Sequence, residues 1–176
     1  EAEGSINGEG FAYEQGIFTD SKALYFPGGE REENTVLLPN NVLVNDSYSV
    51  SMWIHTKISN PWSSALYVKF ESGFMGIVPL AFEGNSVCRI RDSRHVNGWY
   101  DVAACPLTEQ AWFHYVMTYN AKTESAMVFV NGEPVGHLEN VPANRFVNRV
   151  VVGGDVFQPS FNGHICELIF YNEVKD

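Results

Sequence analysis

The sequence predicts an all-β protein, built as a two-sheet antiparallel β-sandwich of the jelly-roll type. Residues 112–136 read as three short strands joined by tight turns, and residues 48–56 alternate between the two faces of a strand. No stretch repeats apolar residues at helical spacing over three turns. A three-stranded meander cannot bury its own apolar face, so another part of the chain must cover it.

Length and composition agree with one packed domain. The chain has 176 residues, of which 45% are hydrophobic and 14% aromatic. We expect residues 1–22 to be an irregular lead-in packed on the domain and residues 23–176 to form the sandwich. The net charge of −10, without a Lys/Arg cluster, argues against nucleic acid. No apolar run approaches the roughly 18 residues of a membrane span, so membrane insertion is not expected.

The strands follow in order from short apolar or alternating runs bounded by turn residues. In residues 48–56, Val50, Met52 and Ile54 share one face, as half-buried strands require. Asn131-Gly132 predicts a type I′ hairpin turn, and Pro27-Gly28-Gly29 predicts another turn. The expected strands are 23–26, 35–38, 48–56, 65–71, 74–82, 86–92, 99–104, 112–119, 126–130, 133–136, 149–152 and 165–171.

The order of these motifs resembles the laminin-G-like, or concanavalin A-like, jelly-roll superfamily. It is most similar to carbohydrate-binding modules appended to carbohydrate-active enzymes. The matching stretches are ALYFPGG (23–29), YSVSMWI (48–54), AWFHYVMTYN (111–120), MVFVNGEPVG (127–136), VVVGGD (150–155) and FNGHICELIFYN (161–172). The resemblance implies two sheets of six or seven strands, with a ligand site commonly on the concave one.

The resemblance also implies a structural calcium ion near the loop after the first matching strand, contacted from the last strand. Family members commonly carry Asp after the first strand and Asp-Glu in the last, where this chain has Pro27 and Cys166-Glu167. Carboxylate oxygens suit calcium. The candidate ligands are therefore Glu30, Glu32 and Glu167. Alternatively, the glutamates near residue 30 form a solvated acidic loop and Glu167 binds a partner in the core.

Cys88 and Cys105 flank one candidate hairpin, whose turn we place near Asn97-Gly98. With a bulge they would face each other as the disulfide of an exported protein. Alternatively, they are two buried thiols. Cys166 reads as a small core residue.

The densest group of aromatic and polar residues lies in residues 89–100 (RIRDSRHVNGWY). Aromatic rings suit the C–H face of a sugar, and arginine or histidine can bind its hydroxyl or carboxylate groups. The strands lack the paired carboxylates of a glycosidase. The candidate ligand-binding residues are Arg89, Arg91, Arg94, His95, Trp99, Tyr100, Trp62 and Tyr67. Alternatively, Trp99 or Tyr100 belongs to the core and the arginines pair with Asp92 and Asp101.

These features predict a non-catalytic module that binds an oligo- or polysaccharide at the cell surface or outside the cell. A neighbouring catalytic domain in a longer chain would fit this role. The alternatives are a protein-interaction or adhesion domain of the same fold, and, third, a glycoside hydrolase or polysaccharide lyase.

Overall fold

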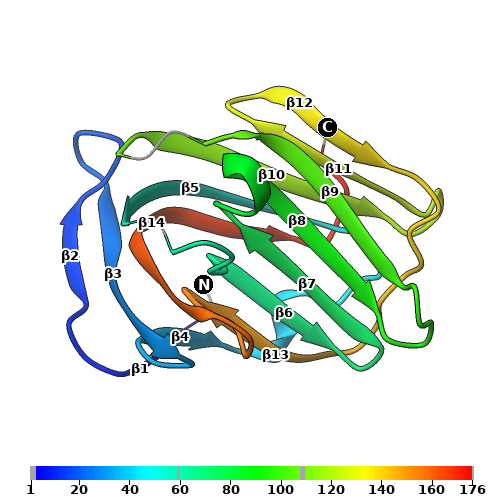
Figure 1. Cartoon of the computed structure of the whole chain (residues 1–176), viewed down its shortest axis with the longest axis horizontal. Coiled ribbons are helices and arrows are strands. Elements are labelled where there is room, and N and C mark those ends of the chain that lie inside the picture. The colour runs from blue at the N-terminus through cyan, green and yellow to red at the C-terminus, as the bar shows by residue number, and fades with distance from the viewer. Residues whose placement is uncertain (1–2, 59, 108–109, 176) are drawn as a thin grey trace.

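A computed structural model describes residues 3–58, 60–107 and 110–175, without the side chains of residues 58 and 103–105. Within these ranges the chain forms two antiparallel sheets of seven strands each, which confirms the predicted β-sandwich (Figure 1). We name each sheet after one strand. The β8 sheet has the order β1 (Ser5–Asn7), β4 (Thr35–Leu38), β13 (Val147–Val152), β6 (Leu66–Phe70), β7 (Gly73–Val78), β8 (Asn85–Asp92) and β9 (Trp99–Pro106).

The β5 sheet lies behind the β8 sheet in Figure 1. Its strand order is β12 (Glu133–Leu138), β11 (Ser125–Val130), β10 (Trp112–Asn120), β5 (Tyr48–Ile58), β14 (Pro159–Tyr171), β3 (Lys22–Arg31) and β2 (Ala12–Gln15). Two short 3-10 turns complete the described elements, η1 (Asn40–Val42) and η2 (Phe82–Gly84). No helix among the described residues has the length and apolarity needed to cross a membrane.

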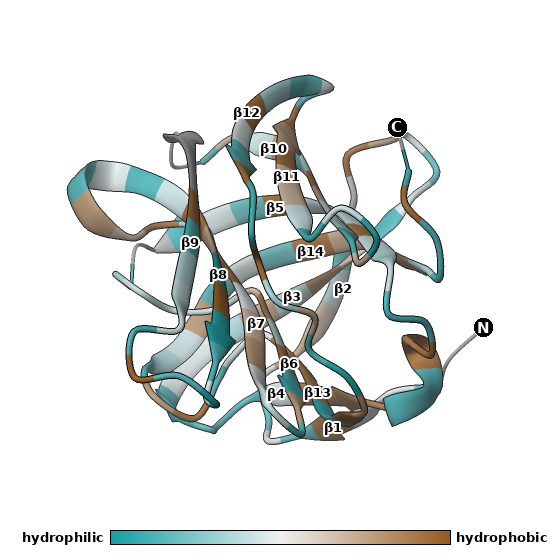
Figure 2. Cartoon of the chain, turned by 90° about the vertical axis from the view of Figure 1, so that its right-hand side faces the viewer, coloured by the Kyte–Doolittle hydropathy of each residue, from teal (hydrophilic) through white to brown (hydrophobic). Residues whose placement is uncertain are grey.

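The core fills the space between the sheets and follows the predicted alternation. Val50, Met52 and Ile54 of β5 are fully buried, and Tyr115 and Met117 of the neighbouring β10 join them. Hydrophobic and hydrophilic positions alternate along the strands, as the banding in Figure 2 shows. Each sheet therefore turns one face inward and leaves the other for solvent or a ligand.

The Asn131-Gly132 turn between β11 and β12 is confirmed. Both residues have positive φ angles, 52° and 85°, as a type I′ turn requires. Asn131 also fixes the turn to β10, because its backbone N–H donates to the carbonyl of His114.

The first 22 residues differ from the expected irregular lead-in. Strand β1 pairs with β4 and strand β2 pairs with β3, so this segment adds one edge strand to each sheet. The side chains of both strands are exposed. Edge strands with exposed side chains carry no apolar alternation, which is why the sequence pattern did not reveal them.

The predicted turn at Pro27-Gly28-Gly29 is instead part of strand β3. Gly28 and Gly29 have positive φ angles of 75° and 140°, and the register of β14 shifts nearby, so the glycines form an irregularity inside the strand. The side-chain amide of Asn162 donates to the Pro27 carbonyl over 2.7 Å. Proline and glycine here indicate an irregularity within strand β3, and the strand continues beyond them to Arg31.

Candidate functional site

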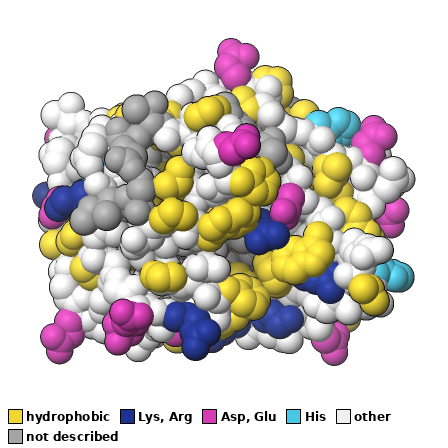
Figure 3. All heavy atoms as spheres, viewed as in Figure 1, with side chains coloured by type: hydrophobic (Ala, Val, Ile, Leu, Met, Phe, Trp, Pro, Cys, Tyr) yellow, Lys and Arg dark blue, Asp and Glu magenta, His cyan; other side chains and the backbone are white. Residues whose placement is uncertain are grey.

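A pocket with a volume of about 360 Å³ opens on the outer face of the β8 sheet. Figure 3 shows this face, where hydrophobic and basic side chains gather over the region of strands β6–β9 in Figure 1. The size suits a small ligand or one to two sugar rings. The lining residues are Trp62, Ser64, Tyr67, Phe74, Gly76, Val78, Arg89, Trp99, Asp155, Phe157 and Gln158.

Strand register brings the lining together. Tyr67 of β6 lies opposite Gly76 of β7, and Gly76 lies opposite Arg89 of β8. Phe74 lies two residues before Gly76 in β7 and therefore lines the same face. Because side chains two residues apart share a face, adjacent hairpins place all of them on the outer side.

Aromatic rings form the walls of the pocket. Trp99 is 48% exposed and Phe157 is 52% exposed. Both pack against Phe74, with ring centroids 5.9 Å and 5.3 Å from its ring. Behind them Tyr67 is almost fully buried. Exposed indole and phenyl surfaces supported by buried rings are rigid apolar platforms.

Arg89 joins the two tryptophans of the site. Its guanidinium carbon lies 4.9 Å from the ring centroid of Trp62 and 4.6 Å from that of Trp99. Its Nε donates to Asp101 over 3.1 Å. Cation–π contacts and an ion pair thus fix the guanidinium beside both rings.

Trp62 is held in an unusual backbone conformation. Its φ angle is +70°, in the left-handed region that bulky side chains rarely adopt, and its backbone N–H donates to the Leu80 carbonyl over 2.7 Å. Its ring packs against Phe82 at 5.3 Å. Such conformations cost roughly 1–3 kcal/mol and are concentrated at binding sites.

The polar end of the pocket is built around Asp155, which is 5% exposed. Ser64 Oγ donates to its Oδ2 over 2.5 Å, and the backbone N–H groups of Phe157 and Gln158 donate to its Oδ1 over 2.6 and 2.9 Å. Burial raises the pKa of Tyr67 to about 12, and the charge of Asp155 adds to this shift. The phenol is therefore neutral at physiological pH.

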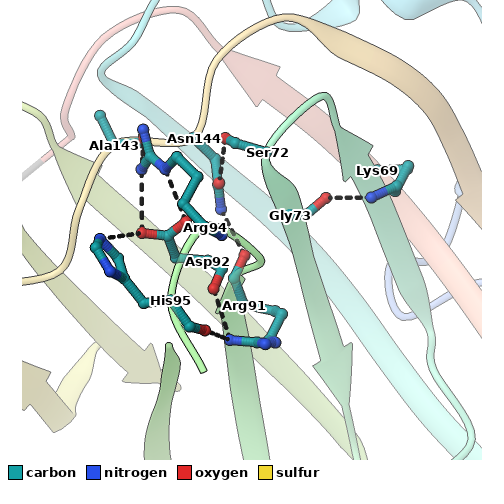
Figure 4. Close-up of polar contacts among 9 residues, drawn as sticks. All are labelled: Lys69, Ser72, Gly73, Arg91, Asp92, Arg94, His95, Ala143 and Asn144. Carbon is teal, nitrogen blue, oxygen red and sulfur yellow. Dashed lines mark hydrogen bonds and ion pairs between the residues drawn. The ribbon is translucent and has the colours of Figure 1, made fainter. Parts of the chain in front are cut away.

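The loop between β8 and β9 is tied to Asp92 rather than to the pocket (Figure 4). Arg94 donates from Nε and Nη2 to the two carboxylate oxygens of Asp92, over 2.7 and 3.2 Å. Arg91 Nη1 donates to the carbonyls of Asp92 and His95, over 2.6 and 2.9 Å. The amide of Asn144 donates to the Arg91 carbonyl over 3.0 Å. These contacts fix the hairpin that carries Trp99.

Asp92→Asn is expected to lower the free energy of unfolding by about 1–2 kcal/mol, because the amide keeps only one acceptor for Arg94. Burial alone raises the pKa of Asp92, but the hydrogen bonds and charge of Arg94 outweigh it and the pKa is lowered from 3.8. The carboxylate therefore stabilises the fold above pH 3.8, and this contribution is lost as the pH falls through the lower folded pKa.

Urea titrations of the wild type and Asp92→Asn between pH 2 and 7 check this prediction. The difference between the two proteins should be constant above about pH 5 and should shrink below about pH 4. A difference that is equally large at pH 2 would contradict the role of the charged carboxylate.

The structure brings four of the eight predicted ligand residues to the pocket, namely Trp62, Tyr67, Arg89 and Trp99. Arg91 is not part of the lining, although its guanidinium carbon lies 4.9 Å from the Trp99 ring centroid. Arg94 and His95 belong to the Asp92 loop, outside the pocket lining. Tyr100 packs against the core between the sheets. It follows Trp99 in the strand, so its side chain points to the opposite face.

Several lining residues were not singled out from the sequence. Phe74, Gly76 and Val78 lie on a strand that is buried along its whole length, so alternation does not tell its two faces apart. Asp155, Phe157 and Gln158 come from a distant loop, joined to β6 by the Gly153 N–H bond to the Ala65 carbonyl. No local sequence signal connects Asp155 with Ser64, which lies 91 positions earlier in the chain.

The three predicted calcium ligands do not converge. Glu30 lies near Ser160 at one end of β14, whereas Glu167 lies seven residues further along the strand, about 20 Å away at the usual rise. Glu32 pairs with Arg149 over 3.1 Å. Within the described ranges, no three His, Cys, Asp or Glu side chains could hold a metal ion. The residues named from the resemblance do not fit a single calcium ion.

The strand register does not support the predicted disulfide. Cys88 is a free, buried thiol and lies opposite Val102 rather than Cys105. The side chain of Cys105 is outside the described residues. Burial raises the pKa of the Cys88 thiol well above its usual range. Cys166 is buried, as expected.

The outer face of the β5 sheet also carries rings, but they pack on one another. His55 lies between Trp112 and His164, with centroids 5.3 and 5.4 Å away. Glu14 Oε2 lies 2.7 Å from His164 Nε2, and the His164 side chain is mostly buried. These rings are buried or half-buried, whereas Trp99 and Phe157 are about half exposed, so the pocket of the β8 sheet is the stronger candidate.

Solved structures with the same architecture are similar over nearly the whole chain. The fourth domain of AbnA, an extracellular GH43 arabinanase from Geobacillus stearothermophilus, solved with arabinotriose, has a TM-score of 0.83 at 21% identity. The match covers 98% of this chain and 84% of that domain. The Ruminococcus gnavus IT-sialidase CBM40 bound to α2,3-sialyllactose has a TM-score of 0.71 at 14% identity, covering 88% of this chain and 91% of that one.

The binding domain of botulinum neurotoxin DC in complex with SialylT has a TM-score of 0.70 at 16% identity, covering 99% of this chain and 44% of that one. At these identities the similarity concerns the fold. No curated protein matches the sequence significantly. The profile of the concanavalin A-like lectin/glucanases superfamily matches residues 29–176. The chain therefore belongs to the concanavalin A-like lectin/glucanases superfamily, as its motif order indicated.

Proposed function

We propose that this chain is a non-catalytic carbohydrate-binding module whose ligand site is the pocket on the outer face of the β8 sheet. The observation that carries the proposal is the exposed Trp99 ring, fixed by Arg89 and Phe74 beside a polar end built around Asp155. One or two sugar rings would stack on Trp99 and Trp62, while hydroxyl groups bind Arg89 and Asp155.

The chemistry of the pocket favours binding over hydrolysis. Asp155 is the only carboxylate among the described residues that line it, and three donors already engage its oxygens. A glycosidase of the usual type needs two carboxyl groups on either side of the scissile bond. The proposed module would hold a glycan close to a catalytic domain in a longer protein, outside the cell. The relatives from an extracellular arabinanase and a sialidase support this placement.

Gly76→Leu is expected to abolish glycan binding while the protein stays folded. A Cβ atom at Gly76 meets no atom closer than Ser64 Oγ at 3.6 Å, so a side chain fits on the backbone. The leucine would then project into the pocket that Gly76 lines. A glycan panel with neutral and acidic sugars, run on the wild type and on this variant, tests the proposal.

Binding by the wild type and loss of at least about 100-fold in Gly76→Leu, with unchanged circular dichroism, would support the proposal. A variant that binds as well as the wild type would refute this location of the site. If the wild type bound no glycan of the panel, the protein-interaction function would be favoured. Exposed apolar surface for a protein partner is present at Phe82, Trp99 and Phe157. Repeating the panel with calcium and with chelator tests the predicted ion.

A further inference from the structure

The charged groups around the pocket point to the kind of sugar that it accepts. Arg89 is the arginine of the pocket lining, and its Nε is already bound to Asp101, 3.1 Å away. Both side chains are about one quarter exposed, so the pair is only partly screened by water. Asp101 therefore balances the charge of Arg89, and the guanidinium keeps its Nη groups for hydroxyl oxygens.

The other arginines of the β8–β9 hairpin are also engaged by the protein. Arg91 donates to two loop carbonyls, and Arg94 forms a two-point contact with the buried carboxylate of Asp92. A carboxylated sugar needs a free guanidinium fork. Arg94 lies outside the pocket lining, and Arg91 donates to loop carbonyls. The hairpin therefore offers only the Nη groups of Arg89 at the pocket, and Asp101 balances their charge.

Asp155 adds a negative charge that forms no ion pair within the described part of the chain. Its hydrogen-bond donors are a hydroxyl group and two backbone amides. Among the described residues, none of the ion pairs, which join a Lys, Arg or His nitrogen to a carboxylate within 4.0 Å, involves Asp155. A buried carboxylate without a cation accepts hydrogen bonds from hydroxyl groups and repels a second carboxylate.

We infer that the pocket selects uncharged sugars and rejects uronic and sialic acids, with Asp101 as the residue that determines this specificity. The inference rests on the proposed function and concerns the same site. Asp155 accepts from the hydroxyl groups of the sugar, and Arg89 donates to them. Asp101 balances the positive charge with which Arg89 would otherwise attract a carboxylate. The charge of the pocket, rather than its shape, separates the two ligand classes.

Matched neutral and acidic glycans test this inference by isothermal titration. Suitable pairs are oligogalactosides with oligogalacturonides, cellobiose with its glucuronic acid counterpart, and lactose with sialyllactose. The wild type should bind a neutral member at least about 10-fold more tightly than its acidic counterpart, as expected for like charges in a binding site.

Asp101→Asn should raise the affinity for the acidic member by about 10-fold, because it removes the negative charge that balances Arg89, and should leave the neutral member within about 3-fold. Asp46→Asn is the matched control. It removes the same charge from an exposed ion pair with Arg145, away from the pocket lining. This control should change neither affinity.

The outcomes separate the two proposals. Wild-type preference for the acidic members would overturn the selection of uncharged sugars while leaving the glycan-binding function in place. An unchanged preference in a folded Asp101→Asn would overturn the role of Asp101. Absence of binding to every member, and to the wider glycan panel, would overturn the proposed function and this inference together. The wild-type comparison decides the selectivity by itself if the variant does not fold.

Discussion

Trp99→Ala is expected to weaken glycan binding by about 30-fold, which corresponds to about 2 kcal/mol. The substitution removes the most exposed indole of the pocket and the ring that supports Arg89. Because the indole is nearly half exposed, its removal costs the fold much less than the removal of a core ring. The Kd measured by titration against the best ligand of the glycan panel checks this prediction.

Tyr13→Ala is the control for Trp99→Ala. Tyr13 is 74% exposed on edge strand β2, in the other sheet, so its loss removes an aromatic surface residue without touching the pocket. The control should bind as the wild type does. Equal affinity for the wild type and Trp99→Ala, with both proteins folded, would contradict the stacking role of Trp99.

Gly73→Ala is expected to lower the free energy of unfolding by about 3 kcal/mol or more, the range of severe backbone clashes. A Cβ atom at Gly73 would lie 1.7 Å from the carbonyl oxygen of Arg91, and a backbone atom cannot move aside as a flexible side chain can. Strands β7 and β8 would have to separate at the Gly73–Asp92 pair. The Asn144 contact with the Arg91 carbonyl would be lost as well.

Gly76→Ala provides a matched control on the same strand. Its Cβ atom meets nothing closer than 3.6 Å, and its backbone φ is not in the left-handed region. Replacing such a glycine by alanine usually leaves stability within about 1 kcal/mol and often raises it. Urea unfolding of both variants measures the two free energies of unfolding that are to be compared. If Gly73→Ala were as stable as Gly76→Ala, the close approach of β7 and β8 would be contradicted.

The fold could be predicted because its signals are local. Val50, Met52 and Ile54 alternate with polar neighbours, and Asn131-Gly132 encodes a hairpin in two residues. The same two-residue alternation explains why Tyr100, predicted as a ligand-binding residue, does not line the pocket. Trp99 and Tyr100 are neighbours in a strand, so the two cannot both face the ligand, and the structure turns Tyr100 inward.

The candidate site could be predicted only in part, because it combines local and distant segments. Arg89 and Trp99 lie in one hairpin, and their proximity follows from the turn between them. Asp155 reaches the same pocket from a loop after β13, through pairing between strands that are far apart in the sequence. The balance of Arg89 by Asp101 depends on side-chain geometry, which periodicity does not encode.

The four tryptophans allow one direct test of the central claim, the location of the site. Trp62 and Trp99 line the pocket of the β8 sheet, whereas Trp53 and Trp112 lie in the β5 sheet. An NMR titration of the nitrogen-15-labelled chain with its best panel glycan would follow the four indole N–H signals. We expect the signals of Trp62 and Trp99 to shift and those of Trp53 and Trp112 to stay in place. Shifts confined to Trp53 and Trp112 would contradict the proposed site.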